Sequence, residues 1–288
     1  MKRVYVVVDL ECISGVTSGA MIRTGSSEWA ARGRHLATAE VNAVIEGALE
    51  AGADTIYVRD SHDSGENLVR EDLHPAAELI AGSTNVTPYL PDLDEGFDAL
   101  FLVGFHARMG THRGHFDHTV TTAAISEIRL NGTPVGEIGL YAAYAGFLGV
   151  PVALVTGDAA GVAEARALFG DIETVAVKTA YGRFAARVPA PETTRPLIRA
   201  ASKRALERPG FVWNVGTPVE VALDFLRSAE ADMAEMVPGG VRSGARTVTY
   251  QHEEPAMTFK AIEAMIKLGG IAANRWAQGL YTSGARVT

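Results

Sequence analysis

The stretch "VVVDLECISG" (residues 6–15) places two acidic residues directly behind a run of valines. The run from Lys2 to Val8 is almost wholly apolar, which is typical of a strand buried on both faces of a sheet. Asp9 and Glu11 follow it, separated by one leucine. Side chains two positions apart in an extended chain point the same way, so both carboxylates can face one site. Left unpaired they would repel each other, and a bound cation removes that conflict.

Apolar runs of the same kind recur along the chain and alternate with helical patterns. The pattern predicts further strands that begin near residues 54, 98, 149 and 171, and helices over 26–51, 136–148 and 159–169. Strands that alternate with helices form a mostly parallel sheet covered on both faces. Asn131-Gly132 is typical of a hairpin turn. We therefore predict a three-layer α/β fold with a mostly parallel central sheet, helices on both faces and a protruding β-hairpin.

The chain of 288 residues is long enough for one large α/β domain, and it shows no repeat, low-complexity segment or obvious linker. We predict a single domain over residues 1–288. Residues 1–180 would form its metal-site core, and residues 181–288 a helical and strand portion of the same domain. The two helical patterns in that portion, over 191–210 and 254–277, are expected to be scaffold.

Composition narrows the choice of partners. The formal net charge of -8 argues against a nucleic-acid partner, because such proteins usually carry a basic stripe. No apolar run is long enough to span a bilayer, and the chain enters its first strand without a signal-peptide pattern. A single cysteine fits a reducing compartment. We expect a cytoplasmic protein, with no nucleic-acid or membrane partner, that acts on a small molecule.

Metal-ligating residue types stand at the ends of the first three predicted strands. Asp9 and Glu11 end the first, His62 ends the second within "RDSH", and His106 ends the third within "GFHA". Ligands of open α/β sheets bind outside the carboxyl ends of the strands, so these side chains should meet at one edge. Zinc takes imidazole nitrogen and carboxylate oxygen, and one carboxylate can bridge two ions about 3.5–4 Å apart.

The motifs "VDLECISG", "RDSH", "GFHA" and "NGTPVGEIGL" together resemble the D-aminopeptidase family associated with bacterial dipeptide-permease operons. The resemblance covers about residues 3–180. It implies a binuclear zinc metallopeptidase that releases N-terminal D-amino acids from short peptides, and a large ring-shaped homo-oligomer such as a decamer. The metal ligands that it implies are Asp9, Glu11, His62, His106 and Glu137. It also implies a catalytic histidine, which falls on His118 within "GHFDHT".

This sequence departs from the family pattern in two places. Cys12 stands where the family usually has glycine, so it would either narrow the site, add a soft ligand or act as a small buried filler. The stretch between His106 and His118 is about one residue longer than in the family. Of the other histidines on that loop, we expect His112 and His115 to be accessory or solvent-facing.

Each candidate ligand also has a purely structural interpretation. Asp9 and Glu11 can cap the next element, and a lone histidine beside an apolar run, such as His106, is usually a core residue. Glu137 lies in the first turn of a predicted helix, where the helix dipole favours any carboxylate. Asp60 and its neighbour Ser61 fit a turn, in which they would hold the loop or orient a ligand.

Three functions remain open from the residues alone. The first is an aminopeptidase with two zinc ions, in which His118 acts as nucleophile, general base or general acid. The second is another binuclear metal amidohydrolase or a phosphoesterase. The third is a non-catalytic protein that binds small peptides and holds a structural metal. An open coordination position separates the enzymes from the third, because structural zinc sites are closed. Selectivity for D-residues rests on the resemblance alone.

Overall fold

The computed structural model describes residues 2–83 and 89–282, with side chains described as far as residue 274. The chain divides into two compact units. The first comprises Met1–Asp117 and Glu137–Asn214, and the second comprises His118–Gly136 and Val215–Thr288. The single domain predicted over residues 1–288 stays a prediction.

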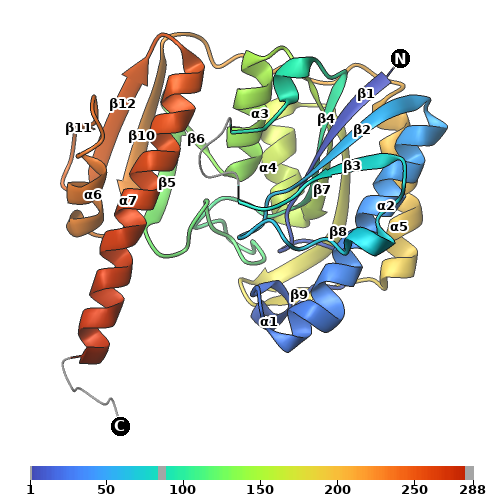
Figure 1. Cartoon of the computed structure of the whole chain (residues 1–288), viewed down its shortest axis with the longest axis horizontal. Helices are drawn as coiled ribbons and strands as arrows, with labels where there is room; N and C mark the ends of the chain where they lie inside the picture. Colours follow the sequence, from blue (N-terminus) through green and yellow to red (C-terminus); the bar gives the residue numbers. More distant parts are fainter. Residues whose placement is uncertain (1, 84–88, 283–288) are drawn as a thin grey trace. The chain divides into compact units, whose positions relative to one another are not determined.

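The first unit is built on a seven-stranded sheet with the strand order β3-β2-β1-β4-β7-β8-β9 (Figure 1). All neighbouring pairs are parallel except β8 and β9. The bounds are β1 Lys2–Val8, β2 Ala53–Asp60, β3 Ala77–Ile80, β4 Ala99–Phe105, β7 Val152–Asp158, β8 Glu173–Gly182 and β9 Ala185–Arg187. The predicted mostly parallel sheet is confirmed, and β3 and β9 are edge strands that the sequence analysis did not anticipate.

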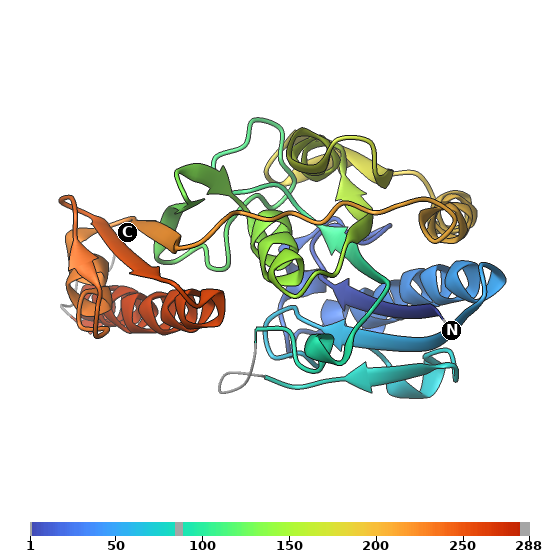
Figure 2. The same cartoon turned by 90° about the horizontal axis from the view of Figure 1, so that it is seen from above.

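Two pairs of helices cover this sheet, which confirms the predicted three layers (Figure 2). One pair is α2 (Arg34–Glu50) and α5 (Pro191–Ala205), and the other is α3 (Glu137–Phe147) and α4 (Ala159–Phe169). A π-helical turn over Trp29–Gly33 leads into α2. The Ser26 hydroxyl accepts a hydrogen bond of 3.1 Å from the backbone N–H of Trp29, as the side chain of a helix N-cap residue does. The short helix α1 is Gly19–Ile22, and 3₁₀ turns lie at Arg70–Asp72 and Leu93–Glu95.

The centre of the sheet is fully apolar where β1 and β4 pair. Every residue of β4 is buried, and so is β1 from Val4 onward. Gly104 near the end of β4 has a φ of 80°, and a Cβ there would lie 2.3 Å from the carbonyl oxygen of Asp9. Its own carbonyl accepts a 2.9 Å bond from the N–H of Cys12. Glycine therefore allows β4 to approach the loop that follows β1.

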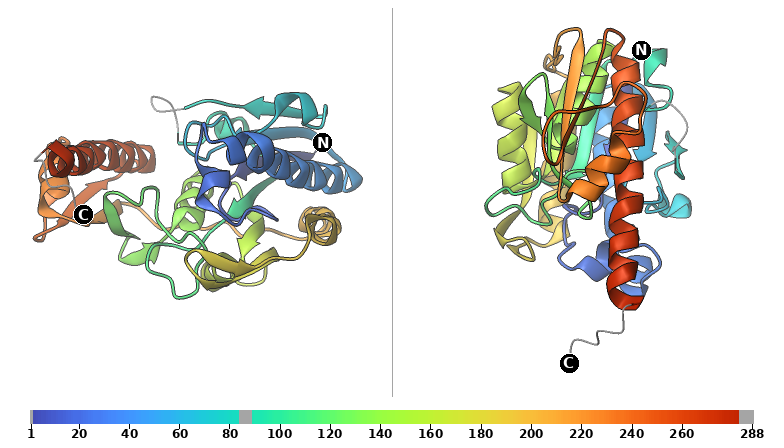
Figure 3. Two further views of the ribbon diagram at one scale, coloured as in Figure 1. Left: turned by 90° about the horizontal axis from the view of Figure 1, so that it is seen from below. Right: turned by 90° about the vertical axis from the view of Figure 1, so that its left-hand side faces the viewer.

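The second unit contains a five-stranded antiparallel sheet with the order β11-β12-β10-β5-β6. The bounds are β5 Ile125–Leu130, β6 Thr133–Val135, β10 Val219–Phe225, β11 Val241–Arg242 and β12 Thr247–His252. Asn131-Gly132 joins β5 and β6, as predicted, but β5 also pairs with β10, so the hairpin is part of a larger sheet. Helices α6 (Ser228–Ala234) and α7 (Pro255–Thr282) pack on β10 and β12 (Figure 3). Across the described ranges, no helix is both long and apolar enough to cross a membrane.

The close approach at Gly104 leads to a stability prediction. Alanine at a positive φ is destabilising by about 1–2 kcal/mol wherever it occurs. Gly104→Ala also drives a methyl group into the backbone of Asp9, and forcing atoms into a packed region adds about 1–3 kcal/mol. We expect urea unfolding to show this extra loss relative to Gly96→Ala, a matched control with a φ of 87° and no atom within 4 Å of the added Cβ. Equal losses would show that the loop moves away freely.

Candidate metal centre

The sheet order brings the five predicted ligands together in the first unit. Strands β2, β1 and β4 are neighbours, and His62, Asp9, Glu11 and His106 all follow the carboxyl ends of these strands. Glu137 is the first residue of α3. Parallel strands end at the same edge, so residues distant in sequence converge there. That these five side chains bind a metal stays a prediction, but the arrangement that binding requires is present.

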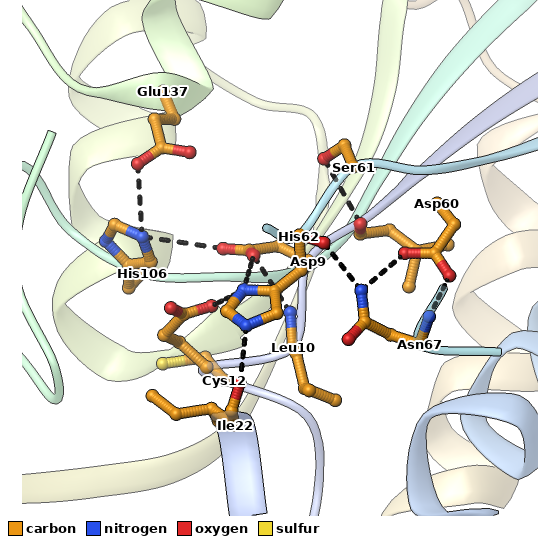
Figure 4. Close-up of polar contacts among 12 residues, drawn as sticks. Asp9, Leu10, Cys12, Ile22, Asp60, Ser61, His62, Asn67, His106 and Glu137 are labelled. Carbon is orange, nitrogen blue, oxygen red and sulfur yellow. Dashed lines mark hydrogen bonds and ion pairs between the residues drawn. The ribbon is translucent and has the colours of Figure 1, made fainter. Parts of the chain in front are cut away.

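The five side chains form two groups that share Asp9 (Figure 4). Its Oδ1 lies 3.3 Å from His62 Nδ1, and its Oδ2 lies 3.4 Å from His106 Nε2. Glu11 completes the first group with an oxygen 2.9 Å from His62 Nδ1. Glu137 completes the second with an oxygen 3.4 Å from His106 Nε2. One oxygen of Asp9 thus faces each group, which is the arrangement of a carboxylate that bridges two cations.

Backbone carbonyls fix the orientation of both imidazoles. His62 Nε2 lies 2.7 Å from the carbonyl oxygen of Ile22, and His106 Nδ1 lies 3.0 Å from that of Ala107. A carbonyl only accepts, so these two nitrogens carry the hydrogens. The opposite nitrogens then point electron pairs at the carboxylates whenever the rings are neutral. Histidines that bind metals are held in this way by a partner behind the ring.

A carboxylate outside the two groups supports the loop that carries His62. The Asp60 carboxylate accepts from the N–H of Asn67 at 2.5 Å and from its side-chain amide at 2.9 Å. The same amide donates to the carbonyl oxygen of His62 at 2.6 Å. Ser61 Oγ bonds back to β1 through the carbonyl of Val8 at 3.2 Å. Asp60 and Ser61 therefore hold this loop, as their turn-forming residue types indicate.

The charges of the site favour a cation. Burial, followed by the Glu11 carboxylate, raises the pKa of Asp9. Burial lowers the pKa of His62 and His106, but the neighbouring carboxylates outweigh it and raise both pKa values well above the usual range. Asp9 Oδ2 is buried and accepts no hydrogen bond from the described residues. A divalent cation satisfies this oxygen, neutralises the carboxylates and accepts the two imidazole electron pairs, so the donor set fits a metal such as zinc.

Cys12 lies beside the site without joining it. Its side chain is buried, and Sγ donates to the carbonyl oxygen of His115 at 3.6 Å. The candidate metal groups among the described residues do not include it. Burial raises the pKa of the thiol well above its usual range, so it stays protonated. Of the three interpretations of Cys12, the structure supports the small buried filler.

The histidines on the loop after β4 differ in exposure. His112 is exposed, as expected. His115 is fully buried, so the expectation that it faces solvent is wrong, and an accessory role for it stays a prediction. The N–H of His115 donates to the Asp158 carboxylate at 2.9 Å, and its ring packs 4.1 Å from the ring of Phe116. Burial, with the positive charge of Lys178, lowers the pKa of His115 to about 4. Its imidazole is neutral at pH 7 for that reason.

His118 belongs to the second compact unit, of which it is the first residue. Its side chain is half-buried, and it directly follows Asp117 of the first unit. The Asp117 carboxylate accepts a 2.7 Å hydrogen bond from the N–H of Gly110. This bond closes the loop of residues 110–117, which directly precedes His118. The catalytic role of His118 stays a prediction.

Three buried charged residues near the five ligands were not identified from the sequence: Glu40, Asp158 and Lys178. Asp158 could have been identified from the sequence, since it stands at the end of the apolar strand β7, much as Asp9 follows β1. Its carboxylate caps α4 by accepting a 2.8 Å bond from the N–H of Gly161. Lys178 lies between Val177 and Thr179 in β8, and a lysine in that setting is ordinarily interpreted as an outward-facing residue.

Comparison with known proteins identifies the family to which the chain belongs. The family model described as D-aminopeptidase, Peptidase_M55, matches residues 1–264. The chain belongs to the D-aminopeptidase family. A "D-aminopeptidase" of Bacillus subtilis (strain 168) is 31% identical over 269 residues, which are 92% of this chain and 97% of the relative. A solved structure, the "Zn-dependent D-aminopeptidase DppA from Bacillus subtilis, a self-compartmentalizing protease", superposes with a TM-score of 0.88 at 31% identity and covers 93% of this chain and 97% of its own.

Membership of the D-aminopeptidase family confirms the resemblance stated from the four motifs, and with it the predicted class of enzyme, a peptidase that hydrolyses peptide bonds. The structural match confirms the predicted α/β fold class. The match to residues 1–264 extends well beyond the 3–180 over which the resemblance was visible. The alternative of a non-catalytic peptide-binding protein is disfavoured accordingly.

The raised pKa values of the site predict that metal uptake releases protons. His62 and His106 must be neutral to bind, and in the metal-free site the carboxylates hold protons on them. Acid therefore competes with the metal, and affinity for a divalent ion should keep rising as the pH increases above about 6.5, the ordinary pKa of histidine. Calorimetry of metal binding in buffers with different ionisation enthalpies measures the released protons. A heat that does not depend on the buffer would contradict this prediction.

Proposed function

We propose that this chain is a zinc-dependent aminopeptidase with two zinc ions per chain, which releases N-terminal D-amino acids from short peptides. The observation that carries the proposal is the Asp9 carboxylate, which presents one oxygen to each of two ligand groups. The solved relative described as a zinc-dependent D-aminopeptidase supports both the choice of metal and the activity. Selectivity for D-residues is supported by the family description and by no single residue of the site.

The number of ligands favours a catalytic site. Each group offers three protein ligands, with Asp9 counted in both. Catalytic zinc sites have three protein ligands and an open position, whereas structural sites are closed by four. Bound zinc ions supply two kinds of chemistry in such a site, polarisation of the scissile carbonyl and a lower pKa for water. The rings of His62 and His106 are each hydrogen-bonded to a backbone carbonyl, and this bond fixes the direction in which the opposite ring nitrogen would bind a metal ion.

We propose that His118 transfers the proton that hydrolysis of the peptide bond requires. Hydrolysis of an amide needs a group that takes a proton from the attacking water or gives one to the leaving amine. Histidine suits this task because its pKa lies near neutrality. The five ligands cannot perform it while they bind metal through the same atoms. The resemblance of "GHFDHT" to the family motif supports His118 over the exposed His112 and the buried His115.

We also propose that the chain assembles into a closed homo-oligomer, such as the ring-shaped decamer that the family resemblance implies. The description of the solved relative as self-compartmentalizing supports assembly of identical subunits. The mass of the purified protein, measured by light scattering, tests this proposal. A monomeric mass at working concentration would contradict it.

The metal count distinguishes the two groups. Wild-type protein should hold about two zinc ions per chain. Asp9→Ala should hold almost none, since both ions lose a ligand, whereas Glu137→Ala should keep about one, in the group it does not join. Elemental analysis of protein purified without chelator measures this series. Asp94→Ala, which removes an exposed carboxylate of the same unit, is the matched control and should keep both ions. A fully metallated, active Asp9→Ala protein would place the site elsewhere.

The role of His118 is separable from metal binding. His118→Ala should keep its zinc while kcat on a D-aminoacyl peptide falls about 10²–10⁴-fold, with a smaller change in KM. His112→Ala removes an exposed histidine of the same loop and should turn over at the wild-type rate. The matched L-aminoacyl peptide should be cleaved far more slowly by the wild-type enzyme. A His118→Ala enzyme that retains more than about a tenth of the wild-type rate would exclude the catalytic role.

A further inference from the structure

Two buried charged side chains contact the loop that carries Glu11, and neither is a ligand in the proposed site. Lys178 lies on β8 with 2% of its surface exposed, and Glu40 lies on α2 with none. A buried charge is strongly unfavourable unless it is paired and hydrogen-bonded. What these two groups bond to therefore indicates what they do in the folded protein.

Lys178 closes the loop from one side. Its ammonium donates to the carbonyl oxygen of Glu11 at 3.1 Å and to that of Val16 at 2.5 Å. These two carbonyls stand at the two ends of residues 11–16, so one side chain fixes both ends of the loop. The bond to Glu11 is made to its own carbonyl. It sets the peptide plane next to the Glu11 Cα, and through that plane the direction of the carboxylate.

Glu40 holds the middle of the same loop. One oxygen of its carboxylate accepts a 2.8 Å bond from the N–H of Ser14, and the other lies 3.4 Å from the hydroxyl of Thr156 on β7. Hydrogen bonds to an ionised group are stronger and shorter than neutral ones, so the loop gains a firm anchor on α2. Ser14 is bonded as well through its hydroxyl, which accepts from Thr194 of α5 at 2.8 Å.

We propose that Lys178 and Glu40 are positioning residues of the metal centre, which fix the backbone of residues 11–16 and so set the affinity of the ion bound beside Glu11. The inference rests on the proposed zinc site. The two residues act through the loop, since their hydrogen bonds go to its backbone atoms. Removing groups behind a metal ligand typically weakens metal binding by about 10–100-fold.

The two groups that share Asp9 differ in whether they take a ligand from this loop. The group of Asp9, Glu11 and His62 takes a ligand from the loop that Lys178 holds. The group of Asp9, His106 and Glu137 takes none from residues 11–16. A loosened loop should therefore weaken the first ion and leave the second nearly unchanged, whereas general damage to the fold would weaken both.

Single-ion backgrounds make this difference measurable. In Glu137→Ala protein the ion beside Glu11 remains, and in His62→Ala protein the other remains. Zinc affinity is measured in each by competition with a chromogenic chelator, with and without Lys178→Met, which removes the ammonium and keeps the length of the side chain. We expect about 10–100-fold weaker binding in the Glu137→Ala background. In the His62→Ala background the change should stay within about twofold, the level at which distant sites add independently.

Two further variants keep the test decisive. Val177→Ala removes buried apolar volume from the neighbouring position of β8 and should change zinc affinity in neither background. Glu40→Gln keeps the size of Glu40 and replaces a charged hydrogen bond with a neutral one, so it should weaken the same ion as Lys178→Met by a smaller factor. If Lys178→Met does not fold, Glu40→Gln alone tests the inference.

The outcomes separate this inference from the proposed function. Wild-type affinity in folded Lys178→Met and Glu40→Gln proteins, in the background that keeps the ion beside Glu11, overturns the inference alone. Equal losses in both backgrounds overturn it too, because they indicate general destabilisation. A wild-type protein that binds no zinc overturns the proposed function and, with it, the positioning role.

Discussion

The site depends on the burial of several carboxylates at one edge of a parallel sheet. Asp9 and Glu11 are almost fully buried, and Glu137 faces the same cluster from the start of α3. Like charges in a low-dielectric setting cannot all remain ionised without a partner. Protons on the two histidines provide a partial solution, as the raised pKa values of His62 and His106 show. A divalent cation would provide the complete one, because it would also satisfy the oxygen of Asp9 that accepts no hydrogen bond from the described residues.

The sheet imposes this crowding on the carboxylates. Strands β2, β1 and β4 run in the same direction, so their ends deliver side chains to one place whatever the separation in sequence. Gly104 lets β4 approach the backbone of Asp9, and Asp60 ties the loop after β2 through Asn67. Four of the five predicted ligands, Asp9, Glu11, His62 and His106, therefore stand on short segments directly after strands of this sheet.

Much of the first unit could be predicted because the apolar run that marks each strand lies next to the candidate ligand that follows it. A valine run that ends in Asp9 and Glu11, or an apolar run that ends in His106, shows both the strand and the functional residue within ten positions. Apart from the Asn131-Gly132 turn between β5 and β6, the second sheet has no such signal. Strand β10 has buried residues at consecutive positions, and its partners β5 and β12 lie far from it along the chain or beyond intervening segments. Pairing of that kind depends on tertiary packing, which short patterns do not record.

The buried charges behind the ligands escaped prediction for a related reason. A strand such as "VAVKTA" gives no sign of whether its lysine reaches solvent or turns inward, because Lys178 finds its partners in the carbonyls of Glu11 and Val16. Backbone acceptors carry no residue identity, so no sequence motif can mark them. His115 was missed for another reason, because its backbone N–H bonds to the carboxylate of Asp158, which lies far from it along the chain.

Cys12 shows how the site keeps its ligand set when a further donor stands next to it. A thiolate beside Glu11 would add another negative charge to a cluster already rich in carboxylates, and burial together with nearby acidic groups raises the pKa of the thiol. The proton stays on sulfur and is used in the bond to the carbonyl of His115. A protonated thiol is a poor metal ligand, since the thiolate is the form that binds. The burial that keeps the proton on sulfur therefore also keeps Cys12 from acting as a metal ligand.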